Sequence, residues 1–324
     1  MERRSEQEMF SLILDTARRD DRIRAVWLNG SRANPGAPRD PWQDFDVVYL
    51  VNRVEDFLAE PDWIDCFGPR LIMQTRHQQT TEENPDFSDW YIYLMQFADG
   101  NRIDLSLVPV ERAAEHFAGD RMQIVLLDKD GRLPRLPSTD SDYLPKPPGR
   151  REFENCCNEF WWVSTYVVKG IWRQELPYAQ GVYNHYVRDA FDQMARWKIG
   201  EDTGFAANPG KMGKYFERFL SRTDWEQLKA TYADGDYEHL RSSLLTLGTL
   251  FGKWGRELAE RYGYTYPEAE EAGVMAFIRS NGGGGVPGQL IGRLPLEGLQ
   301  NTRDLGGLVM QDGRRIRWNR LIRS

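Results

Sequence analysis

The stretch WLNGSRANPGAPRDPWQDFDVVYLV (residues 27–51) sets two carboxylates in a segment that has the composition of a buried strand. Asp44 and Asp46 flank Phe45 and stand directly before the apolar run VVYLV. Side chains two positions apart on a strand point to the same face of the sheet, so the two carboxylates are predicted to lie side by side. Each charge makes ionisation of the other harder, and burial adds to that cost. Such a strand calls for a group that neutralises both charges.

A divalent metal ion meets this requirement. Mg²⁺ binds carboxylate oxygens together with the phosphate oxygens of a substrate. A third carboxylate would let two ions bind and clamp the attacking and leaving oxygens of a phosphoryl-type transfer. Asp104, in the alternating segment RIDLSLVP, is the candidate for this third ligand.

The segment Gly30-Ser31-Arg32 follows the first strand-like run and has the groups that a phosphate site uses. Glycine permits close approach of the backbone, serine donates a hydroxyl, and arginine adds a positive charge. An isolated Asp-x-Asp pair is more often a solvated strand edge. Its combination with Gly-Ser and with a third aspartate in a strand favours metal-dependent phosphate chemistry over that alternative.

Composition argues against several other classes of protein. The formal net charge of −7 and the pI near 5.4 disfavour a nucleic-acid binder and suit a cationic ligand. Three cysteines without a CxxC pair and four scattered histidines disfavour a disulfide framework and a zinc site. The chain has no apolar run of membrane-spanning length, and its start, MERRSEQEMF, lacks a signal-peptide core. We therefore expect a soluble, cytoplasmic monomer that binds neither nucleic acid nor membrane.

Residues 1–132 have the pattern of an α/β domain with a small mixed sheet. Apolar residues at helical spacing predict a helix over residues 3–20, and shorter helices are expected over 54–60 and 110–117. The strands are predicted at residues 23–29, 44–51, 70–75, 90–97, 102–108 and 124–127. A Pro-rich linker, residues 133–150, is predicted to follow this domain.

The pattern changes to helical spacing from residue 151. Helices are expected over residues 153–173, 178–198, 211–220, 224–233 and 237–262, so residues 151–280 are predicted to form an all-α helical-bundle domain. From Asn281 the composition changes again, beginning with NGGGG. The last 44 residues carry net charge +4, whereas the first 280 carry −11. Residues 281–324 are therefore predicted to be a Gly-rich tail foreign to the rest of the chain.

The order Gly-Ser, Asp-x-Asp and a later Asp resembles the nucleotidyltransferase superfamily. More narrowly, the segments AVWLNGSR, QDFDVVYLV, DWYIYLMQFADGNRIDLSLVP, VLLDKDG and CCNEFWWVSTYVVKGIWRQE resemble the aminoglycoside 6-adenylyltransferases that modify streptomycin. The resemblance runs from the N-terminus to about Ile278. It implies transfer of AMP from ATP to an antibiotic hydroxyl, with release of pyrophosphate and hence antibiotic resistance. It also implies a helical domain that closes the cleft and two Mg²⁺ ions.

The resemblance carries over to particular residues of this chain. Asp44, Asp46 and Asp104 would be catalytic metal ligands, and Asp104 would also help to deprotonate the acceptor hydroxyl. The Gly30-Ser31-Arg32 segment would hold the triphosphate. The alternatives are transfer to another hydroxyl acceptor, including another aminoglycoside, and a non-catalytic nucleotide-binding protein.

Other candidate residues could have either a functional role or an ordinary structural one. Lys211 stands at an expected helix start after Asn-Pro-Gly, where it would bind ATP phosphates, or it is a solvated lysine on an amphipathic helix. Glu159, Trp162 and Asp189 are candidates to bind a cationic acceptor. Aromatic residues at helical spacing are more often core residues, and each acidic residue is as readily a surface group.

The tail carries a separate resemblance. The segment LEGLQNTRDLGGLVMQDGRRIRWNRLIRS resembles the opening of the bacterial tyrosine-phosphatase-like family, whose members share an Asn-x-Arg-Asp-Leu-Gly-Gly motif. That family needs a later Cys-x5-Arg loop, and none of the three cysteines here has an arginine six positions on. We therefore expect a truncated phosphatase fragment without a phosphatase site.

Overall fold

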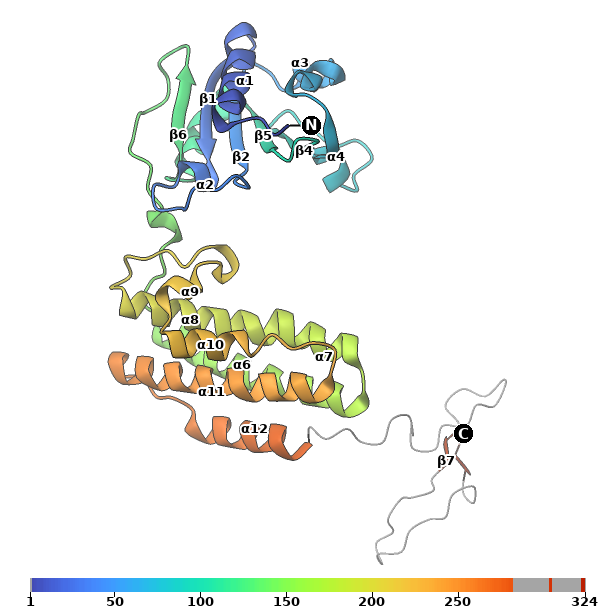
Figure 1. The fold of residues 1–324 in the computed structure, drawn as a ribbon, viewed down its shortest axis with the longest axis vertical. Coiled ribbons are helices and arrows are strands. Elements are labelled where there is room, and N and C mark those ends of the chain that lie inside the picture. Colours follow the sequence, from blue (N-terminus) through green and yellow to red (C-terminus); the bar gives the residue numbers. More distant parts are fainter. Residues whose placement is uncertain (1, 282–302, 305–321, 324) are drawn as a thin grey trace, which may run out of the picture. The chain divides into compact units, whose positions relative to one another are not determined.

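The chain folds into two units, Met1–Leu144 and Pro145–Ser324, with the division inside the Pro-rich segment. The computed structural model describes residues 2–281, 303–304 and 322–323 (Figure 1). The first unit has a mixed sheet and the second is built from helices, in agreement with the predicted fold class. Most of residues 281–324, on which the prediction of a foreign tail rests, lies outside the described residues.

The sheet of the first unit has six strands in the order β3-β4-β5-β2-β1-β6. All neighbouring strands run antiparallel except β2 and β5, which are parallel. The strands are β1 (Ile23–Asn29), β2 (Phe45–Val51), β3 (Arg70–Thr75), β4 (Tyr91–Phe97), β5 (Arg102–Pro109) and β6 (Ile124–Asp128). Each agrees with its predicted range to within one residue at either end.

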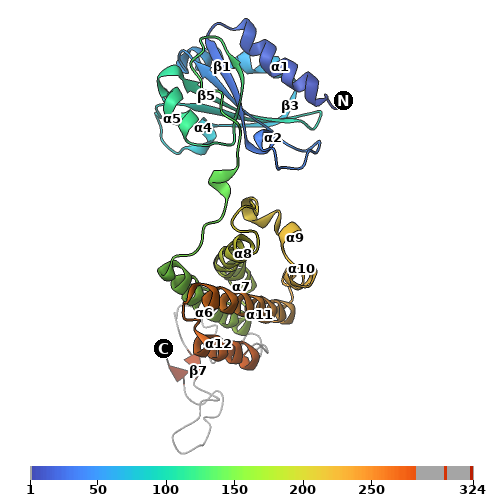
Figure 2. The same ribbon diagram turned by 90° about the vertical axis from the view of Figure 1, so that its left-hand side faces the viewer.

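Helices cover both faces of this sheet, with α1 and α5 on opposite sides (Figure 2). The helical segments are α1 (Glu6–Arg19), α2 (Gly30–Ala33), α3 (Glu55–Leu58), η1 (Pro61–Phe67), α4 (Arg76–Gln79), η2 (Val110–Arg112), α5 (Ala113–Ala118) and η3 (Ser141–Tyr143). Helix α1 begins with a capping box between Ser5 and Glu8, which satisfies free N–H groups of its first turn.

Alternation along β2 decides which face carries the carboxylates. Val47 and Tyr49 pack into the core beneath α1, whereas Val48 and Leu50 pack into the smaller core beneath α5. Asp46 is two and four positions from Val48 and Leu50 along the strand, so its side chain lies on the same face of the sheet, the α5 face.

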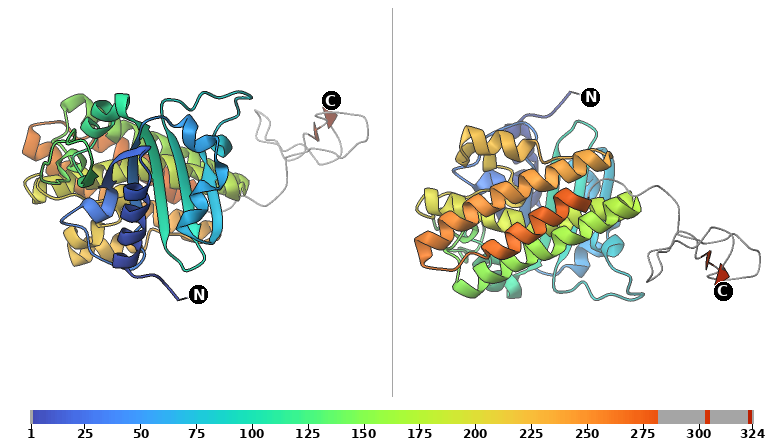
Figure 3. Two further views of the ribbon diagram at one scale, coloured as in Figure 1. Left: turned by 90° about the horizontal axis from the view of Figure 1, so that it is seen from above. Right: turned by 90° about the horizontal axis from the view of Figure 1, so that it is seen from below.

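The second unit is a set of helices around an aromatic core. Its helical segments are α6 (Arg150–Arg173), α7 (Leu176–Val182), the π-helical turn η4 (Tyr183–Val187), α8 (Arg188–Asp202), η5 (Lys211–Gly213), α9 (Phe216–Phe219), α10 (Arg222–Lys229), α11 (Tyr237–Tyr262) and α12 (Glu268–Asn281). Helices α6, α11 and α12 lie side by side (Figure 3, right). In the core, the Phe160 ring stacks on Phe251 with centroids 3.8 Å apart.

One helix prediction in this unit needs correction, and one helix was missed. The expected helix 178–198 lies within residues 176–202, which are helical throughout, with the π-helical turn η4 between α7 and α8. The expected helix 211–220 is interrupted, because Met212 and Gly213 adopt positive φ angles of 55° and 71° that an α-helix does not accept. Helix α12 was not predicted; only Met275 and Ile278 of it are buried, which leaves a weak apolar periodicity.

Two further observations complete the fold. Strands β7 (Arg303–Asp304) and β8 (Ile322–Arg323) pair antiparallel. None of the helices in the described part of the chain combines the length and the apolar character that a membrane crossing requires.

Candidate active site

The three predicted carboxylates lie together at one end of the parallel pair β2–β5. Asp46 and Asp104 are direct partners in the register of these strands, and Asp44 immediately precedes β2. Parallel strands begin at the same end of a sheet, so residues near the two starts are neighbours although 58 positions separate them in the chain. The carboxylates therefore form one acidic cluster.

Gly30 brings the backbone of the β1–α2 turn against this cluster. Its φ angle is +68°, in the left-handed region that glycine accepts readily. A Cβ added here would lie 2.0 Å from Oδ2 of Asp46. Ser31 follows in α2 and is half-buried. The predicted pair Gly30 and Ser31 is thus adjacent to the carboxylates, while its binding of a triphosphate stays a prediction.

Arg32 lies beneath the same turn and is only 5% exposed. Its guanidinium donates hydrogen bonds to the carbonyl oxygens of Gln43 and Asp44 at 2.9 and 3.1 Å. It also pairs with Oε1 of Glu6 at 2.7 Å and stacks on the Phe45 ring. These contacts fix the segment that leads into β2. The contact of Arg32 with a triphosphate stays a prediction.

The cluster raises the cost of ionising Asp46. Burial, and then the charges of Asp104 and Asp44, raise the pKa of Asp46 to about 6. Burial also raises the pKa of Asp44, although Arg102 opposes that shift. The folded chain therefore shows the predicted effect, in which neighbouring carboxylates make one another harder to ionise.

Arg102 is a charged member of the site that the sequence analysis missed. It begins β5, two residues before Asp104 and on the same face. Its Nε and Nη2 donate to the two oxygens of Asp104 at 2.7 and 2.8 Å, and its Nε is 3.7 Å from Oδ2 of Asp44. The i, i+2 spacing in GNRIDL could have indicated this ion pair.

Asn29 is the second residue that sequence reasoning missed. It is the direct partner of Asp46 in the β1–β2 register. Its side-chain oxygen is buried, and in the described structure it has no hydrogen-bond donor. A buried acceptor without a donor is costly, and a bound cation or a donor from a ligand would satisfy it.

The donor chemistry of this site fits Mg²⁺. Three carboxylates and an unsatisfied amide oxygen are hard oxygen donors, the type that Mg²⁺ prefers. Within the described residues, however, no three His, Cys, Asp or Glu side chains are placed so as to surround an ion. Arg102 accounts for part of this arrangement, because its guanidinium occupies both oxygens of Asp104.

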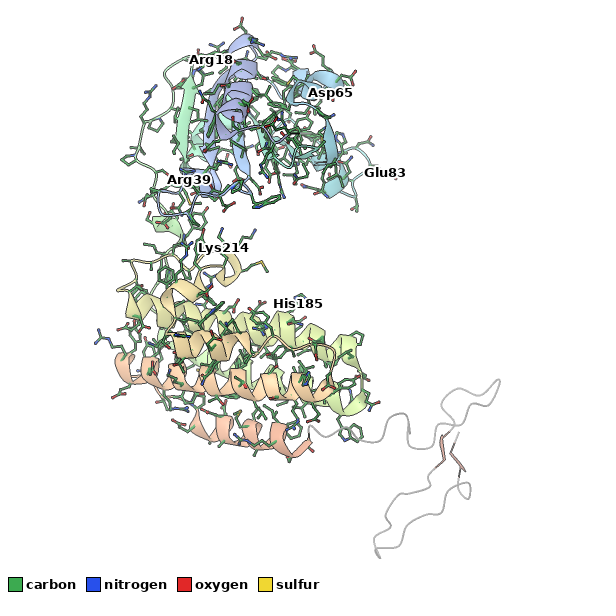
Figure 4. The ribbon with its side chains drawn as sticks, viewed as in Figure 1. Arg18, Arg39, Asp65, Glu83, His185 and Lys214 are labelled. Carbon is green, nitrogen blue, oxygen red and sulfur yellow. The ribbon has the colours of Figure 1, made fainter. Side chains whose placement is uncertain are left out.

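Lys211 belongs to the second unit, on the short segment η5, and its side chain is exposed. It is not at the start of a regular helix as predicted, since the chain turns at Met212 and Gly213. Figure 4 shows Lys214, three residues on, extending from the ribbon near α9. Both lysines are thus accessible to a ligand.

The three residues predicted to bind the acceptor also lie in the second unit, and all are exposed. Glu159 and Trp162 are one turn apart on α6, and Trp162 is 58% exposed with its ring edge against Tyr166. Asp189 is on α8, where the Cys156 thiol of α6 donates to the neighbouring carbonyl of Ala190 at 3.2 Å. This contact joins the turn of α6 that precedes Glu159 to the first turn of α8, which carries Asp189.

Comparison with known proteins covers almost the whole described chain. Residues 3–281 match the family model described as streptomycin adenylyltransferase, and residues 294–324 match one described as tyrosine phosphatase family. An aminoglycoside 6-adenylyltransferase of Bacillus subtilis (strain 168) is 41% identical over 270 residues, which is 83% of this chain and 95% of that protein. One of Campylobacter jejuni is 39% identical over 83% of this chain and 93% of its own.

A solved structure is similar as well. The crystal structure of an aminoglycoside 6-adenyltransferase from Bacillus subtilis shares 37% sequence identity and covers 85% of this chain and 98% of its own, with a TM-score of 0.42.

Proposed function

Because the chain belongs to the streptomycin adenylyltransferase family, we propose that it transfers AMP from ATP to a hydroxyl group of streptomycin and so gives resistance to the antibiotic. The acceptor oxygen forms a bond to the α-phosphorus, the bond from the α-phosphorus to the bridging oxygen breaks, and pyrophosphate leaves. The hydroxyl proton passes to a base. The observation that carries the proposal is the alignment of Asp44, Asp46 and Asp104 at the start of one parallel strand pair.

Within this proposal the three carboxylates would hold Mg²⁺, with two ions as the expected number. When bound, the metal neutralises the charge that develops on the phosphate oxygens. Asp104 is the proposed proton acceptor for the hydroxyl. Gly30 admits the triphosphate close to the backbone because it has no Cβ, and Ser31 offers its hydroxyl.

The chain's other groups have supporting roles in the proposal. Arg32 keeps Asp44 in place through the carbonyl of that residue, and its charge adds to the attraction for phosphate. Lys211 would bind the triphosphate. Glu159, Trp162 and Asp189 would contact streptomycin, whose guanidinium groups suit carboxylates and an exposed aromatic ring. The proposed setting is a cytoplasmic monomer, where ATP is available.

The test is release of pyrophosphate from ATP and Mg²⁺ with a panel of aminoglycosides. We expect release with streptomycin, no release without an acceptor, and loss of release in Asp104→Asn at unchanged thermal stability. Turnover only with another aminoglycoside would move the proposal to that acceptor. Binding of ATP without turnover of any acceptor would favour a non-catalytic nucleotide-binding protein.

A further inference from the structure

Within the described part of the first unit, Arg102 is the arginine whose guanidinium lies against two carboxylates of the acidic cluster, Asp104 and Asp44. We propose that Arg102 is a positioning residue that holds Asp104 and Asp44 in the metal-free enzyme and competes with Mg²⁺ for them. This inference rests on the proposed function, because it takes the cluster to be a metal site.

The geometry shows why the two cations compete. Arg102 engages both oxygens of Asp104 through a two-pronged hydrogen bond at 2.7 and 2.8 Å. Its Nε lies 3.7 Å from Oδ2 of Asp44, so one guanidinium is shared by two of the three carboxylates. The guanidinium engages one lone pair on each oxygen of Asp104 and places a positive charge beside it, so it repels a metal ion that approaches the same carboxylate. Asp104 is therefore a weaker ligand for Mg²⁺ while Arg102 is paired with it, and a stronger one when Arg102 turns away.

The exposure of Arg102 shows that it is able to turn away. Its side chain is 40% exposed, so the guanidinium can exchange its carboxylate partners for water. Arg32 provides the contrast within the same site. That side chain is 5% exposed and is held by two backbone carbonyls and by Glu6, so it cannot leave without breaking the segment before β2. The two arginines thus have different roles: Arg32 fixes the backbone, and Arg102 is an exchangeable counter-ion.

The charge balance explains why a counter-ion is useful here. Three carboxylates at the start of two adjacent strands repel one another when no metal is bound. An arginine beside them keeps Asp104 and Asp44 ordered and facing the site in that state. It also weakens metal binding, because the free energy of breaking its ion pairs is subtracted from that of ligation.

The experiment measures Mg²⁺ binding without nucleotide, by thermal midpoint and by calorimetry, in the full chain. Arg102→Ala is compared with Arg102→Lys and with Arg24→Ala. Arg24 is a matched control because it also pairs with an aspartate, Asp130, and is 25% exposed, but it lies at the other end of β1. We expect the Mg²⁺ concentration at half effect to fall about twofold to fivefold in Arg102→Ala, the range for losing a partly screened competing ion pair.

Each result decides between the possibilities. Arg24→Ala should keep the wild-type Mg²⁺ midpoint. The Mg²⁺ midpoint of Arg102→Lys should lie between those of the wild type and Arg102→Ala, since lysine retains the charge but not the two-pronged contact. Equal or weaker Mg²⁺ binding in Arg102→Ala would overturn the inference and leave the metal site intact. If Mg²⁺ affects none of the proteins, including the wild type, the metal site of the proposed function fails and the inference fails with it.

Discussion

Gly30 approaches Asp46 so closely that a Cβ on residue 30 would lie 2.0 Å from Oδ2 of the aspartate. The position of the Asp46 carboxylate and that of the turn backbone therefore depend on each other. The turn cannot carry a side chain unless Asp46 moves, and Asp46 is the carboxylate of the site whose pKa is raised to about 6. Local chain geometry thus acts directly on the proposed chemistry.

Gly30→Ala should abolish adenylyl transfer by displacing Asp46, with a fall of about a hundredfold or more in kcat/KM. Gly131→Ala is the matched control, because Gly131 also has a positive φ angle, +65°, but a Cβ there meets nothing within 4 Å. Both variants carry a backbone strain of about 1 kcal/mol, so both should show a small fall in thermal midpoint. Near wild-type transfer by Gly30→Ala would show that Asp46 does not depend on this contact.

Asp46→Asn should abolish transfer and stabilise the metal-free fold. The pKa of Asp46 is about 6 in the folded chain against an ordinary value of 3.8. The folded state therefore holds this proton more tightly than the unfolded state, and the free energy of unfolding decreases as pH rises through this window. Above it the cost of ionised Asp46 is about 2–3 kcal/mol.

Thermal midpoints at pH 4 and pH 8 without Mg²⁺ check this prediction. Asp46→Asn should exceed the wild type at pH 8 and converge with it at pH 4. Asp15→Asn, which removes a carboxylate from an exposed pair with Arg18, serves as the control and should gain nothing at pH 8. A less stable Asp46→Asn at pH 8 would mean that the charge is already compensated.

The double variant Glu159→Gln/Asp189→Asn should weaken binding of streptomycin selectively. Both carboxylates are exposed, so each contributes a screened attraction to a guanidinium group. The KM for streptomycin should rise about threefold to tenfold, with less dependence on salt, while that for ATP stays unchanged. Glu226→Gln/Glu238→Gln removes the same charge from α10 and α11 and is the control. A rise in KM of equal size in the two double variants would show that the effect comes from the net charge of the protein and not from Glu159 and Asp189 in particular.

Lys211→Ala should raise the KM for ATP far more than that for streptomycin. Loss of a charge-assisted phosphate contact is worth roughly 1.5–3 kcal/mol, or about ten- to a hundredfold. Lys214→Ala is the matched control three residues away, since that lysine is also exposed and its ammonium lies over the Tyr215 ring. Small and equal effects of Lys211→Ala on the KM values of both substrates would show that Lys211 is a solvated lysine that does not bind ATP.

Strands such as β2, β4 and β5 could be predicted from the sequence because their residues are mostly apolar or alternate between apolar and polar, and such patterns are local. The opposition of Asp46 and Asp104 could not, because it depends on the parallel pairing of β2 with β5. Two strands with alternating residues give no sign of which neighbour each will choose. The resemblance to a family, and not the periodicity of the sequence, indicated that the three carboxylates belong to one site.

The roles of the arginines and of Lys211 show a second limit. The residue after Gly-Ser is predicted to bind phosphate, and that role stays a prediction. The hydrogen bonds of the Arg32 guanidinium to the carbonyl oxygens of residues 43 and 44 could not be predicted from the sequence. The segment after Gly210 reads as a helix, but Met212 adopts a left-handed conformation that no residue-by-residue propensity indicates. Tertiary contacts decide both cases.

Residues 282–324 should be dispensable for adenylyl transfer. Helix α12 ends at Asn281, and the match to the streptomycin adenylyltransferase family model also ends at residue 281. The relative from Bacillus subtilis is matched over 95% of its length by 83% of this chain, so nearly all of that protein is matched without the rest of this chain. The sequence of the segment is also opposite in charge to the rest, +4 against −11 with the boundary at residue 281.

A chain ending at Asn281 should keep the rate of transfer and the thermal midpoint of the full chain. A chain ending at Gly273 is the control, because it also removes Met275 and Ile278, whose side chains are buried against the helical core. Losing two buried apolar side chains costs about 2–5 kcal/mol each, so this chain should unfold many degrees lower. If the chain ending at Asn281 lost as much as the chain ending at Gly273, residues 282–324 would have to contribute to the folded enzyme. Unchanged values for the longer chain, together with a large loss for the shorter, would place the boundary of the enzyme at the end of α12.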